Sequence, residues 1–185
     1  MTISSFLDPL EPYNLAWFQA INASSDASHI SIQIAHIFAV YTAYILLAFL
    51  ALFWFYGDKR AKTTVVKSLV VVAITLCMSQ LIMMVYAHPR PFVMGVGTAF
   101  LEHKPTPSFP SHHMIFFSSI LFSFVLSRYY VIAAFFALLS VLVAWARIYL
   151  GVHFPFDMIG ALILSFFVAL LCEGLFQKIQ KRRAL

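Results

Sequence analysis

Five long runs of apolar residues, separated by short polar segments, dominate the pattern of this chain. A helix rises about 1.5 Å per residue and the hydrocarbon core of a membrane is about 30 Å thick, so roughly 20 apolar residues can cross it. The pattern predicts an all-α integral membrane protein, a bundle of about five transmembrane helices in a single domain over residues 1–185. The predicted spans are about Ile32–Tyr56, Thr64–Ala87, Ser111–Leu126, Tyr129–Leu150 and Pro155–Phe176.

The first 30 residues mix apolar and polar positions and contain no predicted span. Their apolar side chains favour a helix that lies on the membrane surface, with Trp17 at the depth of the lipid headgroups. A poorly ordered N-terminus is the alternative interpretation. The residues of the predicted apolar stripe are Phe6, Leu7, Leu10, Leu15, Trp17, Phe18 and Ile21.

Three further polar segments separate or follow the spans. Residues 57–62 are predicted to form a short charged turn, and residues 177–185 a polar, basic tail. Residues 88–110 form the longest interior polar segment, and their five prolines exclude one continuous helix. A loop of this length in a compact membrane protein is usually functional.

The composition places the chain in a lipid environment. Hydrophobic residues make up 62% of it and charged residues only 10%, whereas about a quarter of the residues of a soluble domain are charged. The net charge of +5 could suggest a nucleic-acid partner. However, the basic residues are dispersed over loops and the tail, without a basic arm or an RNA-binding signature, so no nucleic-acid binding is expected.

The basic residues predict the orientation in the membrane. With five spans, nine of the twelve Lys and Arg residues fall on one side and three on the other. Because positive charge is retained in the cytoplasm, the C-terminus is predicted to be cytoplasmic and the N-terminus to lie outside. The nine are Lys59, Arg60, Lys62, Lys67, Arg128, Lys178, Lys181, Arg182 and Arg183.

Ionisable side chains are concentrated in three patches, at residues 88–92, 108–113 and 147–157. Such groups are unfavourable in hydrocarbon, so their concentration in three places indicates a functional site. With five spans, all three patches are predicted to lie on the non-cytoplasmic side of the membrane. Guanidinium groups bind phosphate oxygens and imidazoles attack or move protons, so the predicted ligand is a phosphate. The candidate residues are His88, Arg90, Ser111, His112, His113, Arg147, His153 and Asp157.

In the third patch, His153 and Asp157 are four residues apart and Pro155 is predicted to begin a helix between them. This spacing can bring the carboxylate onto one imidazole nitrogen and leave the other free to attack. Arg147, at the end of the preceding helix, is close enough in sequence to reach the same phosphate. The alternative is an interfacial His and Asp, with an Arg that extends to the headgroups.

The second patch places Ser111 and His113 at the start of a helix, where backbone N–H groups favour an anion. A serine nucleophile is an alternative, although no Gly-x-Ser-x-Gly elbow accompanies it. A metal half-site is another, for which Glu102 and His103 are the extra ligand candidates. No metal or other cofactor is expected.

The first patch contributes Arg90, which lies between Pro89 and Pro91. These prolines restrict the backbone and limit the entropy lost when the guanidinium is ordered. An isolated Arg-Pro at a membrane boundary would usually be a topological flank, but its alignment with the other two patches indicates a function.

Together the three patches resemble the signature of the type 2 phosphatidic acid phosphatase superfamily, whose pattern is KxxxxxxRP, then PSGH, then SRxxxxxHxxxD. The resemblance covers roughly residues 86–160, and its last spacing is specific. Three positions depart from the pattern: Met83 replaces the lysine, His112 the glycine and Ala146 the serine. The residues of the three motifs are similar to those of the bacterial undecaprenyl-diphosphate phosphatase branch of this superfamily, which commonly lacks that lysine.

The resemblance implies a two-step hydrolysis without a metal. His153 would attack the terminal phosphorus with Asp157 orienting it, and His113 would protonate the leaving oxygen and then activate water. The resemblance implies that Arg90, Ser111 and Arg147 hold the phosphoryl oxygens. His88 and His112 have no family role, and one of them is expected to touch the second phosphate.

The expected function is the release of phosphate from undecaprenyl diphosphate at the outer face of a bacterial inner membrane. The same chemistry on another lipid is an alternative, such as phosphatidylglycerol phosphate, phosphatidate or lipid A, as is a phosphotransferase. A non-catalytic carrier of an anionic lipid is a more distant one. The expected partners are the lipid substrate and the bilayer, and the sequence does not determine an oligomeric state.

Overall fold

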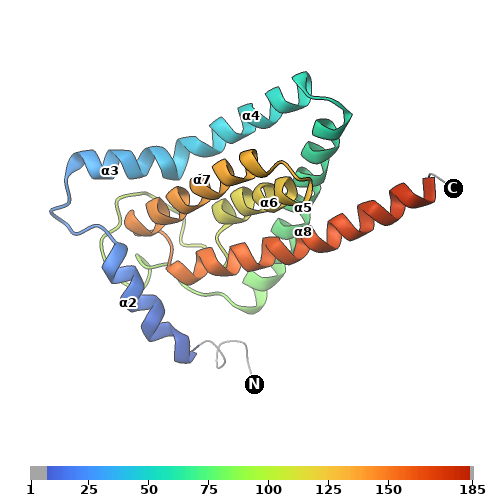
Figure 1. Ribbon diagram of the computed structural model, residues 1–185. Helices are drawn as coiled ribbons and strands as arrows, with labels where there is room; N and C mark the ends of the chain where they lie inside the picture. Colours follow the sequence, from blue (N-terminus) through green and yellow to red (C-terminus); the bar gives the residue numbers. More distant parts are fainter. Residues whose placement is uncertain (1–7, 184–185) are drawn as a thin grey trace.

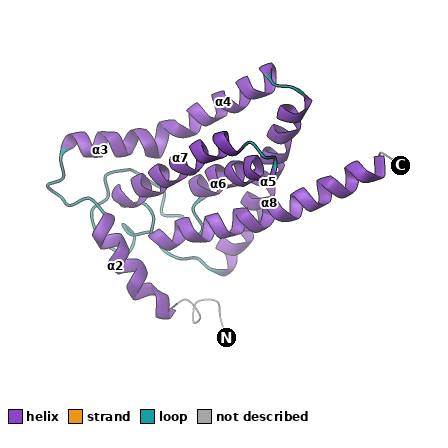
Figure 2. Cartoon of the chain, viewed as in Figure 1, coloured by secondary structure: helices purple, strands orange, loops and turns teal. Residues whose placement is uncertain are grey.

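Every regular element that the structure describes, from residue 8 to residue 183 of this computed structural model, is helical (Figures 1 and 2). This confirms the predicted all-α class. A short turn η1 (Asp8–Leu10) comes first, and a π-helical turn η2 (Ile37–Tyr41) joins α3 to α4. The α-helices are α2 (Glu11–Ile21), α3 (His29–His36), α4 (Thr42–Tyr56), α5 (Lys59–Val85), α6 (His112–Leu126), α7 (Tyr130–Tyr149) and α8 (Pro155–Arg183).

Four helical segments are long and apolar enough to cross a membrane: His29–Tyr56, Lys59–Val85, Tyr130–Tyr149 and Pro155–Arg182. The remaining predicted span, Ser111–Leu126, is present as α6, but the 15 residues of this helix extend only about 22 Å. Helix α6 lies at the centre of the bundle and packs against α5, α7 and α8 (Figure 1). Side chains on opposite faces of it, such as Ile115 and Phe117, are therefore buried.

Two predicted polar segments are helical instead. Only Gly57 and Asp58 form the turn expected at residues 57–62, because the Asp58 carboxylate accepts a hydrogen bond from the N–H of Ala61 at 2.8 Å and caps α5. The basic tail continues α8 as far as Arg183, since Lys, Arg and Gln are good helix formers. The predicted turn over residues 57–62 was therefore wrong in its length, whereas the tail is polar and basic as predicted and is in addition helical.

The predicted N-terminal helix exists as α2, but it is anchored in the protein as well as exposed. Phe18 is fully buried, with its ring centroid 5.1 Å from that of Phe154, whereas Trp17 is half exposed and meets the edge of Phe156. The side chain of Asn22 donates to two backbone carbonyls after α2 ends. Phe6 and Leu7 of the predicted stripe lie outside the described residues, and the placement of α2 at a membrane surface stays a prediction.

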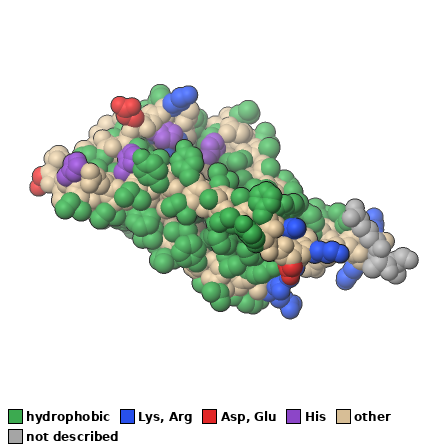
Figure 3. All heavy atoms as spheres, turned by 90° about the horizontal axis from the view of Figure 1, so that it is seen from above, with side chains coloured by type: hydrophobic (Ala, Val, Ile, Leu, Met, Phe, Trp, Pro, Cys, Tyr) green, Lys and Arg blue, Asp and Glu red, His purple; other side chains and the backbone are tan. Residues whose placement is uncertain are grey.

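The two ends of the bundle differ in chemistry. The loop after α5 and the turn between α7 and α8 lie at the end where α2 packs, whereas the α4–α5 turn and the end of α8 lie at the other (Figure 1). From above, histidines gather at the first end and most visible Lys and Arg side chains at the second (Figure 3). At that second end, Lys67 of α5 forms a 2.8 Å ion pair with Glu173 of α8.

Candidate active site

The three polar patches of the sequence meet at one end of the bundle. Arg90 follows α5 in the long loop, Ser111 is the N-cap of α6, and Arg147 lies in the last turn of α7. His153 precedes α8 and Asp157 lies in the first turn of that helix. All five side chains are buried, although they are polar or charged.

The turn that carries His153 depends on Gly151. This glycine has φ +76°, and a Cβ there would lie 2.3 Å from the carbonyl oxygen of Thr98. Pro155 then begins α8, and the Asp157 carboxylate accepts a hydrogen bond from the N–H of Phe154 at 2.8 Å. The glycine, the proline and the acidic residue of the first helical turn thus shape the backbone on both sides of His153.

His153 and Asp157 form a buried pair. The Nδ1 of His153 lies 3.0 Å from Oδ2 of Asp157, so an ionised carboxylate fixes the proton on Nδ1 and leaves Nε2 as the basic nitrogen. Nε2 lies 3.1 Å from Nη1 of Arg90 and 3.4 Å from Oγ of Ser111. Burial, and then the positive charges of Arg147 and Arg90, hold the pKa of His153 well below its ordinary value, which keeps the ring neutral and nucleophilic.

Arg90 ties the long loop to the turn that carries His153. Its guanidinium donates to the carbonyl oxygens of Thr106, Pro107 and Val152, at 2.9, 3.3 and 2.8 Å. Burial lowers the pKa of Arg90, and the negative charge of Asp157 partly opposes this shift. The position of Arg90 is therefore set by the backbone around it, while Nη1 stays directed at His153.

Arg147 has donors without acceptors. It is 2% exposed, and its Nη1 lies 3.4 Å from Nε2 of His113. Its Nε and Nη2 are buried and have no hydrogen-bond partner among residues 8–183. Two guanidinium groups, those of Arg90 and Arg147, thus act electrostatically on His153, and buried donors without a partner are unfavourable. An anion with several acceptor oxygens, such as a phosphate, would satisfy them.

A pocket of about 460 Å³ opens over His153. His112 and His113 line it from α6, and Arg90 from the long loop, so these predicted residues do come together. Its α5 wall is largely apolar. The lining residues are Gln80, Met83, Met84, Arg90, His103, Thr106, Pro107, His112, His113 and His153.

His88 is the exception among the predicted site residues. It lies behind Asp157, away from the pocket, where Nδ1 is 3.1 Å from Oγ of Ser108 and Nε2 is 3.2 Å from Oε2 of Glu11. Both ring nitrogens face other side chains, and His88 does not line the pocket. The predicted contact of His88 with substrate therefore does not agree with the structure. His112 does line the pocket, with its Nε2 3.4 Å from Nε2 of Gln80.

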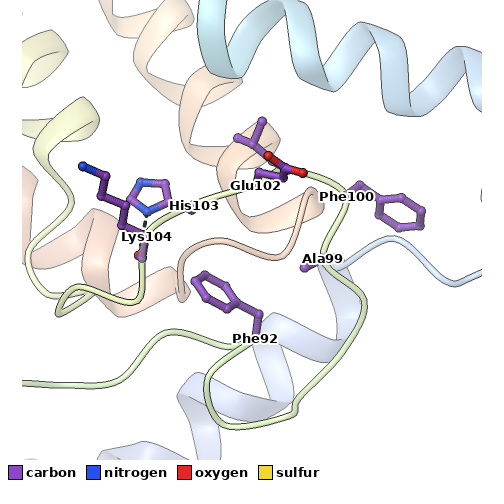
Figure 4. A pocket seen from close by; sticks show the side chains of 7 residues that line it. Phe92, Ala99, Phe100, Glu102, His103 and Lys104 are labelled. Atoms are coloured by element: carbon purple, nitrogen blue, oxygen red, sulfur yellow. Dashed lines mark hydrogen bonds between the residues drawn. The ribbon is translucent and has the colours of Figure 1, made fainter.

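The sequence interpretation gave no site role to Thr106 or Ser108, and it considered His103 only as a ligand of the alternative metal half-site. His103 and Thr106 line the pocket from the loop, and the hydroxyl of Ser108 donates to Oδ1 of Asp157 at 3.2 Å. His103 also faces an open groove of about 750 Å³ between residues 92 and 104 (Figure 4), and desolvation lowers its pKa. Their position in the long Pro-rich loop was the available signal. Within residues 8–183, no three His, Cys, Asp or Glu side chains are grouped as metal ligands.

Comparison with known proteins finds a family match and related chains. The model of the PAP2 superfamily matches residues 64–181. The chain is 32% identical to the candidate undecaprenyl-diphosphatase YbjG of Escherichia coli, over 83% of this chain and 78% of that protein. It is 26% identical to the undecaprenyl-diphosphatase BcrC of Bacillus subtilis, over 83% and 81% respectively.

The fold has a solved counterpart. The crystal structure of a transmembrane PAP2 type phosphatidylglycerolphosphate phosphatase from Bacillus subtilis superposes with a TM-score of 0.68 at 20% identity, covering 95% of this chain and 91% of that one. At this identity the likeness concerns the fold alone. The motifs, the family match and the shared fold agree: the chain is a membrane protein that belongs to the PAP2 superfamily.

Proposed function

We propose that this protein is a lipid phosphatase that removes the terminal phosphate of undecaprenyl diphosphate through a phosphohistidine on His153. The observation that carries the proposal is the arrangement around Nε2 of His153. Asp157 holds the opposite ring nitrogen, Arg90 and Ser111 lie beside Nε2, and Arg147 keeps two buried donors without partners among the described residues. A phosphoryl group at Nε2 would accept hydrogen bonds from Arg90, Ser111 and Arg147.

In the first step, Nε2 of His153 attacks the terminal phosphorus, and the bond from this phosphorus to the bridging oxygen breaks. His113 gives a proton to that oxygen, which leaves as undecaprenyl phosphate. The two guanidinium groups stabilise the charge that spreads over the equatorial oxygens. Asp157 stabilises the positive charge that the ring gains.

In the second step, His113 takes a proton from water, and the water oxygen attacks the phosphorus of phosphohistidine. The phosphorus–nitrogen bond breaks, inorganic phosphate leaves, and Nε2 of His153 is restored. Because the N–H of Nδ1 is held by Asp157 throughout, the ring returns to the same tautomer. No other group has to change its protonation state.

A polyprenyl substrate fits the wall that α5 gives to the pocket. Met83 and Met84 line this wall, and Met84 is 80% exposed on the outer surface of the helix. The pocket is therefore continuous with an apolar surface on which a lipid chain can lie. Met83 occupies the position where the family pattern has a lysine, so the wall has no added cation there. The names of the relatives YbjG and BcrC support the same substrate.

We also propose that the site faces the outside of a bacterial inner membrane and that the C-terminus is cytoplasmic. Support comes from the separation of charge, since Lys59, Arg60 and Lys178 lie at the end of the bundle opposite the site. A fluorescent protein that folds only in the cytoplasm, fused to the C-terminus, should fluoresce. A dark fusion with intact enzyme would contradict this orientation.

The function is tested by phosphate release from undecaprenyl diphosphate by the detergent-purified protein, with and without EDTA. We expect activity in both conditions and its loss in His153→Ala. His29→Ala provides the matched control, because His29 is exposed at the start of α3, and it should retain wild-type activity. Rapid quenching of a reaction with labelled terminal phosphate should trap an acid-labile phosphate on the wild-type protein only.

Other outcomes separate the alternatives. Release from phosphatidylglycerol phosphate, phosphatidate or a lipid A phosphate, but not from undecaprenyl diphosphate, would replace the substrate and keep the chemistry. Label that appears in a second lipid instead of free phosphate would identify a phosphotransferase. Full activity of His153→Ala, or strict dependence on an added metal, would overturn the mechanism.

A further inference from the structure

A continuous chain of hydrogen bonds leads from α2 to the proposed nucleophile. Oε2 of Glu11 lies 3.2 Å from Nε2 of His88, and Nδ1 of His88 lies 3.1 Å from Oγ of Ser108. Oγ of Ser108 lies 3.2 Å from Oδ1 of Asp157, whose Oδ2 lies 3.0 Å from Nδ1 of His153. Four contacts thus connect residues that are as much as 142 positions apart in the sequence.

The direction of each hydrogen bond follows from the acceptors that surround Ser108, because the buried carboxylate of Asp157 and a backbone carbonyl can only accept hydrogen bonds. Its carboxylate is 1% exposed, and Oδ2 already accepts from Phe154 and His153. The one hydroxyl proton of Ser108 can be donated to Oδ1 of Asp157 or to the carbonyl oxygen of Pro89, each 3.2 Å away. In both cases Nδ1 of His88 must donate to Oγ of Ser108. Nε2 of His88 and Oε2 of Glu11 consequently share one proton, carried either by the ring or by the carboxyl group.

The surroundings leave the His88 ring little freedom. Its side chain is 11% exposed, stacks on Tyr86 with ring centroids 5.6 Å apart, and meets Phe154 edge to face. A small cavity of about 30 Å³ lies beside it, lined in part by Glu11, Asn14 and Asp157. This volume holds one water molecule, and Oε1 of Glu11 is buried without a hydrogen-bond partner in the described chain.

We propose that Glu11 and His88 are positioning residues that act on His153 through Ser108 and Asp157. The inference rests on the proposed function, because it requires His153 to be the attacking group. Neither residue lines the substrate pocket, so neither is assigned a contact with the lipid. Their effect is to keep Oδ1 of Asp157 bound, so that Oδ2 remains on Nδ1–H and Nε2 keeps its direction toward phosphorus.

The assignment predicts an effect on kcat rather than on KM. In Glu11→Ala, His88 loses its anchor, and kcat for phosphate release should fall about tenfold. This is the lower end of the effect of removing an outer hydrogen-bond partner of a metal-binding histidine, which is taken here as an analogy. KM should change less than about twofold, since Arg90 and Arg147 still hold the phosphate. Glu11→Gln should restore kcat to within about threefold of wild type, because its amide N–H can donate to Nε2 of His88.

A double-mutant cycle tests whether the effect passes through Ser108. Glu11→Ala should lower kcat about tenfold in the wild-type background but less than about twofold in a Ser108→Ala background. Equal losses in both backgrounds would overturn the relay. Trp17→Ala is the control for general loosening of α2, because Trp17 packs on Phe156 and is not one of the residues of the relay. A loss of kcat in Trp17→Ala as large as in Glu11→Ala would also overturn it.

The outcomes distinguish this inference from the function on which it rests. A wild-type protein without phosphate release from any lipid, or an active His153→Ala, contradicts the proposed function. An active wild-type protein and an inactive His153→Ala, together with wild-type kcat in Glu11→Ala, contradict the relay alone. Thermal unfolding of each variant should show that Glu11→Gln and Glu11→Ala remain folded at the assay temperature.

Discussion

Nη1 of Arg90 lies 3.1 Å from Nε2 of His153, so the proposed nucleophile and a phosphate-binding cation are separated by a single hydrogen bond. The same Nη1 donates to the carbonyl oxygen of Val152, which ties the guanidinium to the turn that carries the nucleophile. A phosphoryl group that enters between the two residues would replace this contact by a bond to each. The site is thus preorganised to bind a phosphoryl group.

Replacing Asp157 by asparagine should abolish most of the activity without unfolding the site. The amide N–H would donate to Nδ1 of His153, which moves the ring proton to Nε2 and removes the lone pair that attacks. By analogy with the corresponding change in a Ser-His-Asp triad, we expect kcat to fall by roughly 10³- to 10⁴-fold. Phosphate release measures this, with Asp26→Asn, at a site that is not buried, as the control. A loss below tenfold would contradict the role of Asp157.

Arg147→Leu should separate stability from function. In the unliganded protein the buried Nε and Nη2 lack partners in the part of the chain that is described, so an apolar side chain should raise the melting temperature or leave it unchanged. Inorganic phosphate should stabilise the wild type, by about 2.7 kcal/mol at 100 times its Kd, but not this variant. Arg182→Leu, in the exposed end of α8, should keep the phosphate effect. A phosphate effect that persists in Arg147→Leu would contradict the assignment.

The stability of the protein should decrease on acidification because of His153. Its pKa lies below the ordinary value in the folded protein, so at pH values under about 6.5 the unfolded chain binds a proton that the folded ring does not. The contribution is fully present above pH 6.5 and decreases by up to about 1.4 kcal/mol per pH unit below it. Denaturation at pH 7.5 and 5.5 should therefore show a smaller loss for His153→Gln than for the wild type. An equal loss of stability in the two proteins would mean that the protonation of a group other than His153 causes the pH dependence.

Two glycine substitutions should have opposite outcomes. Gly151→Ala places a side chain at φ +76° and 2.3 Å from the oxygen of Thr98, so it should destabilise the protein by more than about 1 kcal/mol and displace His153. Gly174→Ala, in α8 with no atom near the added Cβ, should be neutral or stabilising by up to about 1 kcal/mol. Thermal unfolding and phosphate release of the two variants provide the comparison. Wild-type activity of Gly151→Ala would contradict the importance of this turn.

Local relationships of the site could be predicted from the sequence. The pairing of His153 with Asp157 needs only the four-residue spacing and the helix that Pro155 begins, and both are contained in one short segment. The apolar runs similarly predict the helices, because the pattern that indicates each helix is contained within one run of the sequence. Predicted helix ends differed where a cap such as Asp58, or residues with high helix propensity, extended a helix into charged sequence.

Long-range relationships could not be predicted in the same way. The role of His88 depends on Glu11, which is 77 residues away, and on a loop whose path its prolines restrict but do not determine. The sequence shows that Arg147 is charged, whereas only the packing around it shows that two of its donors are buried without partners in the described chain. Contacts that depend on how several helices pack together are therefore the part that required the structure.

The shortness of α6 has a consequence for the depth at which catalysis occurs. Its 15 residues extend about 22 Å, against a hydrocarbon thickness of about 30 Å, so a bundle whose longer helices reach both membrane surfaces cannot have both ends of α6 at those surfaces. With Ser127 at one surface, Ser111 and His113 lie about 8 Å below the other. In the proposed function, the lipid would then reach His153 by lateral diffusion within the bilayer, and water would have to enter the bundle from the membrane surface.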